Sequence, residues 1–589
     1  MQAASNCGRM ACVMQSRIGL LSLFPKWSSS MELTMEDTLG LLHAITTFLR
    51  THQALWSAHV VEFFYDRLWE DVDKQWWTDL ERASIQDLLW LPSGRVQDTW
   101  CDSLKNFVRT AQSLALFRQP GENIEKIFPG FCKPKISNLL RQGMNAKKIH
   151  EVELLSGVIN RIFGEAHASQ VVDVGAGQGY LAQVLAFEYG LPVVALDACA
   201  HHADVTNRRS ERLKKHYTSC SKKMSQNSIT KDCVNVAGPQ TATFRVMSGT
   251  SQMELPYFLS TLALQKSSDP MMEAAHKRGN HDSFGRADIA GAIDQSSQSE
   301  LMNKAQHSYI LAGLHACGDL SATMLKTYVM CEEVRAVVTV GCCYNLLSEN
   351  CGGVQLSGQC YGFPLSEGVK NLGITLGRRA CDLACQSAER WKDVGIESAL
   401  YNFEQHALRA GFQLVLHRYY PALAKSNPTI GRLGKTRRRK QTKRHVSLES
   451  TVNASCSSSW QCVEETASQP DNLSVSNQMQ CKQNKFVEFT SAAFQRLGLP
   501  CLAAEQLEAV WEEIEPKTVL VGPYWSLRAV LGPVLETFIL LDRLLYLQEQ
   551  IQFVPEGTDM SVGLRKPKLI ALFDPNVSPR NMAIIAVKS

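Results

Sequence analysis

One short stretch of the chain gathers the residue types from which nucleotide sites are built. It reads QVVDVGAGQGYLAQVLAFEYGLPVVALD over residues 170–197, and its two acids and three regularly spaced glycines are Asp173, Gly175, Gly177, Gly179 and Asp197. Glycines in a tight turn leave the backbone open to a ligand, because no Cβ atom stands in the way. A carboxylate about 20 residues further on can accept hydrogen bonds from both hydroxyls of a ribose. The spacing therefore predicts a nucleotide site.

The elements that must position these residues are a strand, a turn, a helix and a second strand. Residues 171–174 are mostly apolar, which is typical of a buried parallel strand. Residues 180–189 show the periodicity of a helix, which Gly190 ends. Residues 192–196 form the second strand, so Asp197 lies at its carboxyl end. Doubly wound sheets bind ligands at this edge, where the helix N-terminus also offers free N–H groups.

The details of the glycine pattern separate two classes of nucleotide site. The dinucleotide fingerprint requires its third glycine where Tyr180 stands. The pattern is instead Asp-x-Gly-x-Gly-x-Gly, and Asp173 resembles the acid of motif I in S-adenosylmethionine methyltransferases, which helps to hold the cationic methionine end of that cofactor. A carboxylate directed at a pyrophosphate would repel it. We therefore favour a methyltransferase over a dinucleotide enzyme, with a catalytically inactive methyltransferase fold as the non-enzymatic alternative.

A second group of polar residues follows a predicted fourth strand at residues 310–314. His315, Cys317 and Asp319 come directly after this strand, where the fold places its substrate-side chemistry. An imidazole and a carboxylate at this position suit proton removal or substrate orientation. His315 and Asp319 are therefore the catalytic candidates.

The fifth predicted strand, residues 336–340, is followed by two adjacent cysteines. Four potential ligands would thus end on neighbouring strands and could surround a metal ion: His315, Cys317, Cys342 and Cys343. The alternative is a group of small thiols packed beside the cofactor, which we favour, so no metal site is predicted. A nucleophilic Cys317 is also conceivable, but methyl transfer needs no covalent intermediate.

The helix before the glycine strand opens with Lys147, Lys148, His150 and Glu151. In methyltransferase folds this helix roofs the cofactor, so Lys147 or His150 could face the site. The alternative is an ordinary solvated helix start.

The bulk properties point to a soluble protein of a reducing compartment. The chain has 589 residues, a formal net charge of +4 and 19 cysteines, with no C-x-x-C pair. We expect no membrane association, because no apolar run approaches the ~20 residues of a membrane span. A cytoplasmic or nuclear location is expected. Residues 1–30 contain bases but no acid and could be a mitochondrial presequence, although we favour an upstream extension.

We expect a split α/β fold: a seven-stranded Rossmann-like sheet of the class I methyltransferase type, with a helical N-terminal domain and disordered insertions. The third strand is placed at residues 243–247, and an antiparallel pair at residues 569–573 and 582–587 closes the sheet. Residues 397–420 are expected to hold a helix and an apolar, strand-like run. The expected segments are an extension (1–30), a helical domain (31–130), the first part of the methyltransferase domain (145–425, with insertions near 218–239 and 266–307), a basic and polar linker (426–482), and a C-terminal part that completes the sheet (483–589).

Several motifs of the chain resemble the methyltransferase-like protein 25 family. They are KKIHE, VVDVGAGQGYLA, GLHACGDLS, VGCCY, FPLS, LACQ, ETFILLDRLLYLQEQ and LFDPNVSPRN. The resemblance implies S-adenosylmethionine as cofactor and cofactor-binding roles for the two acids and three glycines of residues 173–197. The pattern His-x-Cys-Gly at His315 also resembles a tRNA ribose 2′-O-methyltransferase family. No Asn-Pro-Pro-aromatic motif follows the fourth strand, which argues against an rRNA adenine dimethylase.

The resemblance supplies no substrate, and RNA and protein both remain open as partners, with RNA favoured. The segment GRLGKTRRRKQTKRH at residues 431–445 could bind phosphates. It lies in a predicted linker, however, and would serve nuclear import equally well. The oligomeric state is not predicted.

Overall fold

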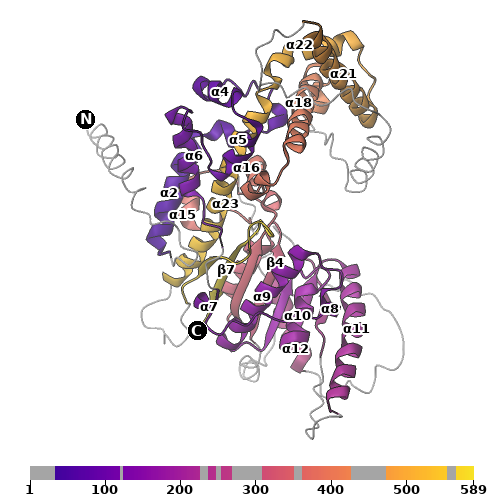
Figure 1. The fold of residues 1–589 in the computed structure, drawn as a ribbon. Coiled ribbons are helices and arrows are strands. Elements are labelled where there is room, and N and C mark those ends of the chain that lie inside the picture. The colour runs from indigo at the N-terminus through magenta and orange to yellow at the C-terminus, as the bar shows by residue number, and fades with distance from the viewer. Residues whose placement is uncertain are drawn as a thin grey trace, which may run out of the picture. The chain divides into compact units, whose positions relative to one another are not determined.

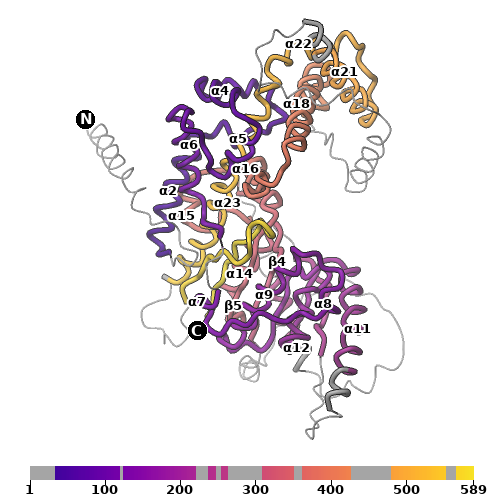
Figure 2. Tube along the Cα trace, viewed as in Figure 1, coloured from indigo at the N-terminus to yellow at the C-terminus, as the bar shows by residue number. Residues whose placement is uncertain are grey.

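A computed structural model describes residues 33–119, 124–225, 237–246, 254–267, 308–350, 361–425, 472–552 and 565–588 (coloured in Figure 1; Figure 2 traces the same chain as a tube). The chain divides into two compact units. The first comprises the described parts of Met1–Thr47, Ser113–Cys385 and Val534–Ser589, and the second comprises those of Phe48–Gln112 and Gln386–Pro533. None of the described helices is long and apolar enough to cross a membrane.

The first unit is built on one seven-stranded sheet with the order β3-β2-β1-β4-β5-β7-β6. The strands are β1 (Gln170–Val174), β2 (Val193–Asp197), β3 (Gln240–Thr243), β4 (Tyr309–Ala316), β5 (Val334–Gly341), β6 (Lys568–Ala571) and β7 (Met582–Val587). Strands β1 to β5 pair in parallel, and β7 runs antiparallel to both β5 and β6. The predicted seven-stranded α/β sheet and its closing antiparallel pair are thereby confirmed.

Helices cover both faces of this sheet, so the alternating side chains of each strand enter two different cores. Val171 and Ile310 pack in the core under α9 (Ala146–Glu165), α10 (Tyr180–Tyr189) and α11 (Ala200–Ser225). Val172 and Leu311 pack in the core under α12 (Glu254–Ser267), α14 (Leu320–Met330) and the C-terminal part of α23 (Val521–Gln552). Figure 1 shows α9 and α10 lying across the sheet. Buried apolar side chains fill both faces, which leaves the carboxyl ends of the strands as the place for a site.

The other helices of the first unit are most of α2 (Met35–Thr51), α7 (Ile124–Ile127), α8 (Asn138–Arg141), the 3₁₀ turn η5 (Tyr344–Leu346), α15 (Glu367–Leu372) and α16 (Gly377–Ala384). Ser137 and Asn145 cap α8 and α9, since each side chain accepts a hydrogen bond from a backbone N–H of the first turn.

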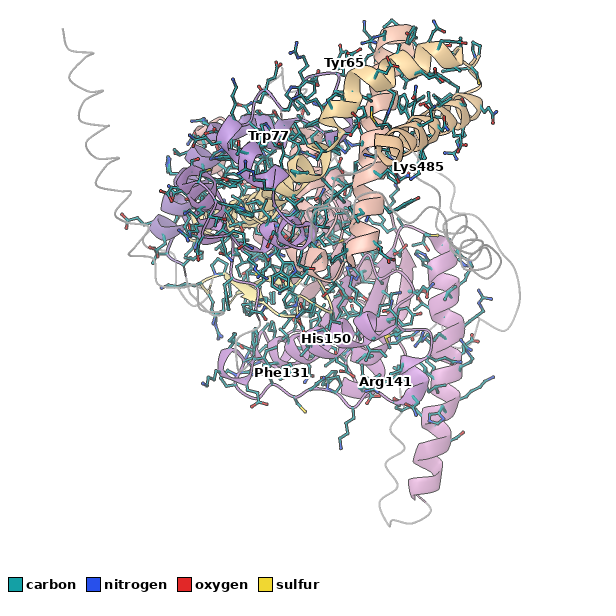
Figure 3. All side chains as sticks on the ribbon, turned by 45° about the horizontal axis from the view of Figure 1, so that its top comes forward. Tyr65, Trp77, Phe131, Arg141, His150 and Lys485 are labelled. Carbon is teal, nitrogen blue, oxygen red and sulfur yellow. The ribbon has the colours of Figure 1, made fainter. Side chains whose placement is uncertain are left out.

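The described part of the second unit is helical throughout. It contains α3 (Gln53–Ser57), η2 (Val60–Glu62), α4 (Lys74–Glu81), α5 (Ile85–Trp90), η3 (Leu91–Ser93), most of α6 (Asp102–Leu114), α17 (Ala388–Lys392), α18 (Ile396–Tyr419), α19 (Pro421–Ala424), α21 (Asn472–Leu497), α22 (Ala504–Thr518) and the start of α23. Trp56, Trp76 and Trp77 are buried in this unit. Tyr65, Trp77 and Lys485 belong to it in Figure 3, whereas Phe131, Arg141 and His150 belong to the first unit.

Several expected boundaries differ from the structure. Strand β3 lies at Gln240–Thr243 and not at residues 243–247, and α18 runs unbroken to Tyr419 where a strand-like apolar run was expected. Helix α11 extends to Ser225, into an expected insertion, and α21 begins at Asn472, inside the expected linker.

The helical unit is also wider than the expected N-terminal helical domain, because it includes Gln386–Pro533. Residues 1–30, the basic segment 431–445 and most of the expected insertions lie outside the described residues.

Candidate active site

The glycine turn connects β1 to α10 in the conformation that its composition predicts. Gly175, Gly177 and Gly179 have φ angles of 77°, 56° and 69°, in the left-handed region that favours glycine. Gly179 is the N-cap of α10, and a Cβ atom there would lie 2.4 Å from Cγ2 of Thr206. The backbone N–H groups of the turn therefore stand at the carboxyl end of β1, beside the first turn of a helix.

Asp197 ends β2 and is tied directly to this turn. Its Oδ2 accepts a hydrogen bond from the Gly177 N–H at 2.8 Å. Its Oδ1 accepts one from the Cys199 N–H at 2.9 Å and lies 2.9 Å from Nδ1 of His202. Burial alone would raise the pKa of Asp197, but the hydrogen bonds from Cys199, His202 and Gly177 outweigh it and lower the pKa. Three of the roughly four acceptor positions of this carboxylate are thus occupied.

Asp173 lies next to the turn and is buried within β1. Burial raises the pKa of Asp173 to about 7, helped by the charge of Asp197 and opposed by the hydrogen bond from the Ala182 amide. Its Oδ2 has no hydrogen-bond partner among the described residues. An orphaned buried carboxylate oxygen beside a nucleotide turn fits a cationic ligand group, as the resemblance to motif I implies.

His315 lies at the end of β4, and a carboxylate from another helix contacts it. Its Nε2 is 3.3 Å from Oε2 of Glu151, which is fully buried on α9. Oε1 of Glu151 accepts a hydrogen bond from the Ser578 hydroxyl at 2.6 Å and lies 3.5 Å from Nζ of Lys147. Burial raises the pKa of Glu151, but His315, Ser578 and Lys147 together lower it below its usual value. The imidazole is thus paired on one side and half-exposed.

Of the residues that open α9, the two predicted candidates, His150 and Lys147, make different contacts. Nε2 of His150 accepts a hydrogen bond from the Asp574 N–H at 3.0 Å, so His150 holds the link between β6 and β7. Lys147 contacts Glu151. The side chain of Glu151 contacts His315 at the end of β4, and it was missed as a site residue. A usable signal was present, because its helical spacing to Leu155 and Val158 places it on the buried face.

Asp319 also follows β4, but it points into a neighbouring loop. Its Oδ1 accepts a hydrogen bond from the Ser348 N–H at 2.8 Å, and its side chain is largely buried. A Cβ atom on Gly362 would lie 2.0 Å from the same oxygen. Asp319 therefore holds the chain that follows β5, and its position separates it from the pair formed by His315 and Glu151.

Three thiols gather where β4 and β5 end. Sγ of Cys317 lies 2.9 Å from Sγ of Cys342, which lies 3.5 Å from Sγ of Cys343. All three sulfur atoms lie within 4.8 Å of one another. His315 does not join this group of possible ligands, so the four residues that the sequence placed together divide into a thiol cluster and a histidine–glutamate pair.

Comparison with known proteins identifies the domain that carries this geometry. Residues 147–350 match a family model described as "Methyltransferase domain". "Probable methyltransferase-like protein 25" of Mus musculus is 26% identical over 645 aligned positions, which cover 93% of this chain and 96% of the relative. The Homo sapiens protein of the same name is 25% identical over 647 positions, with the same coverage. No solved structure gives a significant match. The resemblance to the methyltransferase-like protein 25 family is therefore confirmed over nearly the whole chain, and the chain carries a methyltransferase domain on a Rossmann-like sheet.

Proposed function

We propose that this protein is an S-adenosylmethionine-dependent methyltransferase whose cofactor is held at the carboxyl ends of β1 and β2. The observation that supports this most is the pair of acids at the glycine turn. Asp173 has a buried oxygen without a partner, and Asp197 is held ionised at the end of the next strand. When bound, the cofactor supplies an electrophilic methyl group. The protein therefore has to bind the acceptor, orient it towards this methyl group and remove a proton from it.

The two acids would hold opposite ends of the cofactor. The carboxylate of Asp173 would face the methionine ammonium group, which supplies the missing charge partner. Asp197 would accept the ribose hydroxyls. Because only about one acceptor position of Asp197 is free, a second hydroxyl requires one donor to leave. The imidazole of His202 is the side-chain donor among the three and is half-exposed, so it can rotate away.

His315 is the proposed base on the acceptor side. Oε2 of Glu151 lies 3.3 Å from one ring nitrogen of His315 and would orient the imidazole. The other ring nitrogen remains for the acceptor. Asp319 remains a candidate in the same area, where it would act by holding the Ser348 backbone on the acceptor side.

RNA is the acceptor that we favour. A ribose hydroxyl needs a base, which His315 could supply, and the His-x-Cys-Gly pattern resembles a tRNA ribose methyltransferase family. In addition, Nζ of Lys148 and the guanidinium of Arg209 lie 4.7 Å and 4.4 Å from the ring centre of Tyr180, beside the glycine turn. A cationic and aromatic surface of this kind suits a nucleic-acid strand. Residues 431–445 would add phosphate contacts or direct nuclear import, in keeping with a cytoplasmic and nuclear location.

The acceptor class can be tested with extracts from cells that lack the gene. Extracts pretreated with ribonuclease or with protease are incubated with the protein and radiolabelled S-adenosylmethionine. We expect label that ribonuclease abolishes and protease spares. Label that survives ribonuclease and is lost to protease would instead establish a protein acceptor. Extract incubated with labelled cofactor but without the protein serves as the blank, and a His315→Ala protein should bind cofactor without transferring label.

A non-catalytic scaffold is the competing class, and a thermal-shift measurement separates it. A ligand that binds only the native state raises the melting temperature. We expect S-adenosylmethionine and its demethylated product each to raise it. If neither ligand raised the melting temperature, the cofactor assignment would be wrong and the non-catalytic scaffold would be favoured.

A further inference from the structure

The thiol cluster follows from the register of two neighbouring strands. Ala316 of β4 pairs with Gly341 of β5, so Cys317 and Cys342 leave the sheet side by side. Cys343 follows directly, and its carbonyl accepts a hydrogen bond from the Gly318 N–H at 3.2 Å. The cluster is therefore built on the ends of two central strands, where side chains are positioned more precisely than on a free loop.

The surrounding backbone fixes the two turns that carry the thiols. Gly318 has a φ of 55°, and a Cβ atom there would lie 2.7 Å from the Leu346 carbonyl oxygen, so the turns after β4 and β5 are in close contact. Tyr344 is buried and donates its hydroxyl to Glu536 at 3.0 Å, which fixes the residue after Cys343. Cys385, directly after α16, contacts the turn after β5, because its Sγ lies 3.5 Å from Oδ1 of Asn345.

The spacing of the sulfur atoms matches one small, soft cation. Zinc binds thiolates at about 2.3 Å, which in a tetrahedral arrangement separates the sulfur atoms by roughly 3.8 Å. The sulfur atoms of Cys317, Cys342 and Cys343 lie 2.9 Å and 3.5 Å apart along the chain of contacts and all within 4.8 Å. Small rotamer changes would bring all three to one ion. Thiolates select zinc and similarly soft metals over magnesium or calcium.

A buried arginine beside the cluster provides an independent indication of negative charge. Arg543 is 1% exposed, and its Nε and Nη1 have no hydrogen-bond partner among the described residues. Its Nη1 would lie 2.5 Å from a Cβ atom on Gly341, the residue before Cys342. The adjacent Asp542 is engaged by the backbone N–H groups of Leu365 and Ser366. Three thiolates and one Zn²⁺ carry a net charge of −1, which the buried guanidinium of Arg543 beside them would offset.

We propose that Cys317, Cys342 and Cys343 bind a zinc ion at the carboxyl ends of β4 and β5. His315 is not a ligand, because it contacts Glu151. Within the described residues, no fourth thiol, imidazole or carboxylate joins the three sulfur atoms. The proposal concerns a second site beside the acceptor side of the methyltransferase domain, and it stands whether or not the protein transfers methyl groups.

The test uses the full chain, expressed with added zinc and purified under reducing conditions without chelators. Metal analysis should give close to one zinc per chain, and X-ray absorption at the zinc edge should show three or more sulfur ligands at about 2.3 Å. Fewer than three sulfur ligands would overturn the proposal even if zinc is present. A chain that takes up no zinc and contains a Cys317–Cys342 disulfide would also overturn it and would identify the cluster as a redox pair.

Variants locate the ion. Cys317→Ser and Cys342→Ser should each weaken zinc binding at least tenfold in competition with a chromogenic chelator. Cys132→Ser is the matched control, because Cys132 is an exposed thiol of the same unit. It should bind zinc like the unaltered chain. Circular dichroism establishes that each variant is folded, and equal zinc binding by all three folded variants would contradict the assignment.

Discussion

Glu151 on α9 and His315 at the end of β4 form a pair in which Oε2 of the acid lies 3.3 Å from Nε2 of the imidazole. The acid is fully buried, and the Ser578 hydroxyl from the link between β6 and β7 holds its other oxygen at 2.6 Å. The C-terminal segment thus supports a residue of the proposed acceptor side, in addition to completing the sheet. A pair of this kind orients an imidazole.

Replacing Glu151 with Gln should lower the rate of methyl transfer at saturating substrate by about 10²-fold, because the imidazole loses its charged partner. The affinity for S-adenosylmethionine should not change, and Glu151→Asp should recover part of the rate. Glu153→Gln is the matched control, since Glu153 is also buried on α9 but pairs with Lys133 and Arg141. Equal rate losses in the two glutamine variants would show that Glu151 has only a structural role.

Asp173 should make cofactor affinity depend on pH. The pKa of Asp173 is about 7 in the free protein because the carboxyl is buried, whereas a cationic ligand requires the ionised form. Affinity should therefore fall by up to tenfold per unit as the pH drops below about 7. Calorimetry from roughly pH 5.5 to 8.5 measures this, and Asp173→Asn should bind weakly with little pH dependence. A flat profile for the unaltered chain would contradict this role.

The raised pKa of Asp173 should also affect the stability of the protein without cofactor. The folded chain retains a proton that the unfolded chain releases near pH 3.8, since the pKa of Asp173 is raised to about 7 by burial. Its contribution to stability therefore decreases as the pH rises through that window. Added cofactor should remove this decrease, which thermal unfolding at several pH values with and without ligand can measure.

The last two glycines of the turn should respond differently to alanine. Gly179→Ala creates a Cβ atom 2.4 Å from Thr206 at a φ of 69°, whereas at Gly177, with a φ of 56°, the added atom meets nothing within 4 Å. Both changes strain the backbone by about 1 kcal/mol or more, but only the first adds a clash. Thermal unfolding should rank Gly179→Ala as the less stable, and Thr206→Ala should rescue part of the loss. Equal destabilisation without rescue would contradict the packing.

The strand–turn–helix unit was predictable because its signals are local. An apolar run comes directly before Gly175 and Gly177 in the sequence. Strand β3 was misplaced because QTAT is polar and partly exposed at the sheet edge, whereas the following residues are more apolar. The apolar end of α18 resembled a strand, since short apolar runs do not distinguish the two structures. The contact between Glu151 and His315 depends on how α9 packs on the sheet, which no local pattern specifies.

A buried ion cluster should dominate the acid sensitivity of the first unit. Glu536 pairs with Arg118, with Arg580 at 2.7 Å and with the Tyr344 hydroxyl at 3.0 Å. Burial raises the pKa of Glu536, but Arg118 and Arg580 outweigh it and lower the pKa. Its contribution to stability is therefore present above the ordinary pKa of 4.5 and is lost as the pH falls through the lower folded value.

Glu536→Gln should accordingly destabilise the protein by about 3–5 kcal/mol at neutral pH, because it leaves two buried arginines without a charge partner. The difference from the unaltered chain should shrink below about pH 4.5, which denaturant unfolding at several pH values can follow. The exposed Glu367, paired with Lys370, provides the control. Its replacement by Gln should leave the unfolding midpoint unchanged, and a difference for Glu536→Gln that persists in acid would contradict the linkage.

The central claim is that S-adenosylmethionine binds at the glycine turn with Asp197 as a charged acceptor for its ribose. Titration calorimetry of the unaltered chain, Asp197→Ala and the control Asp204→Ala tests it most directly. Asp204 is an exposed acid in α11, the helix that follows β2. Hydrogen bonds to a charged group contribute ~1.5–3 kcal/mol each, so Asp197→Ala should weaken binding by roughly tenfold or more while Asp204→Ala binds normally. Unchanged affinity in a folded Asp197→Ala protein, or no binding by the unaltered chain, would contradict the account.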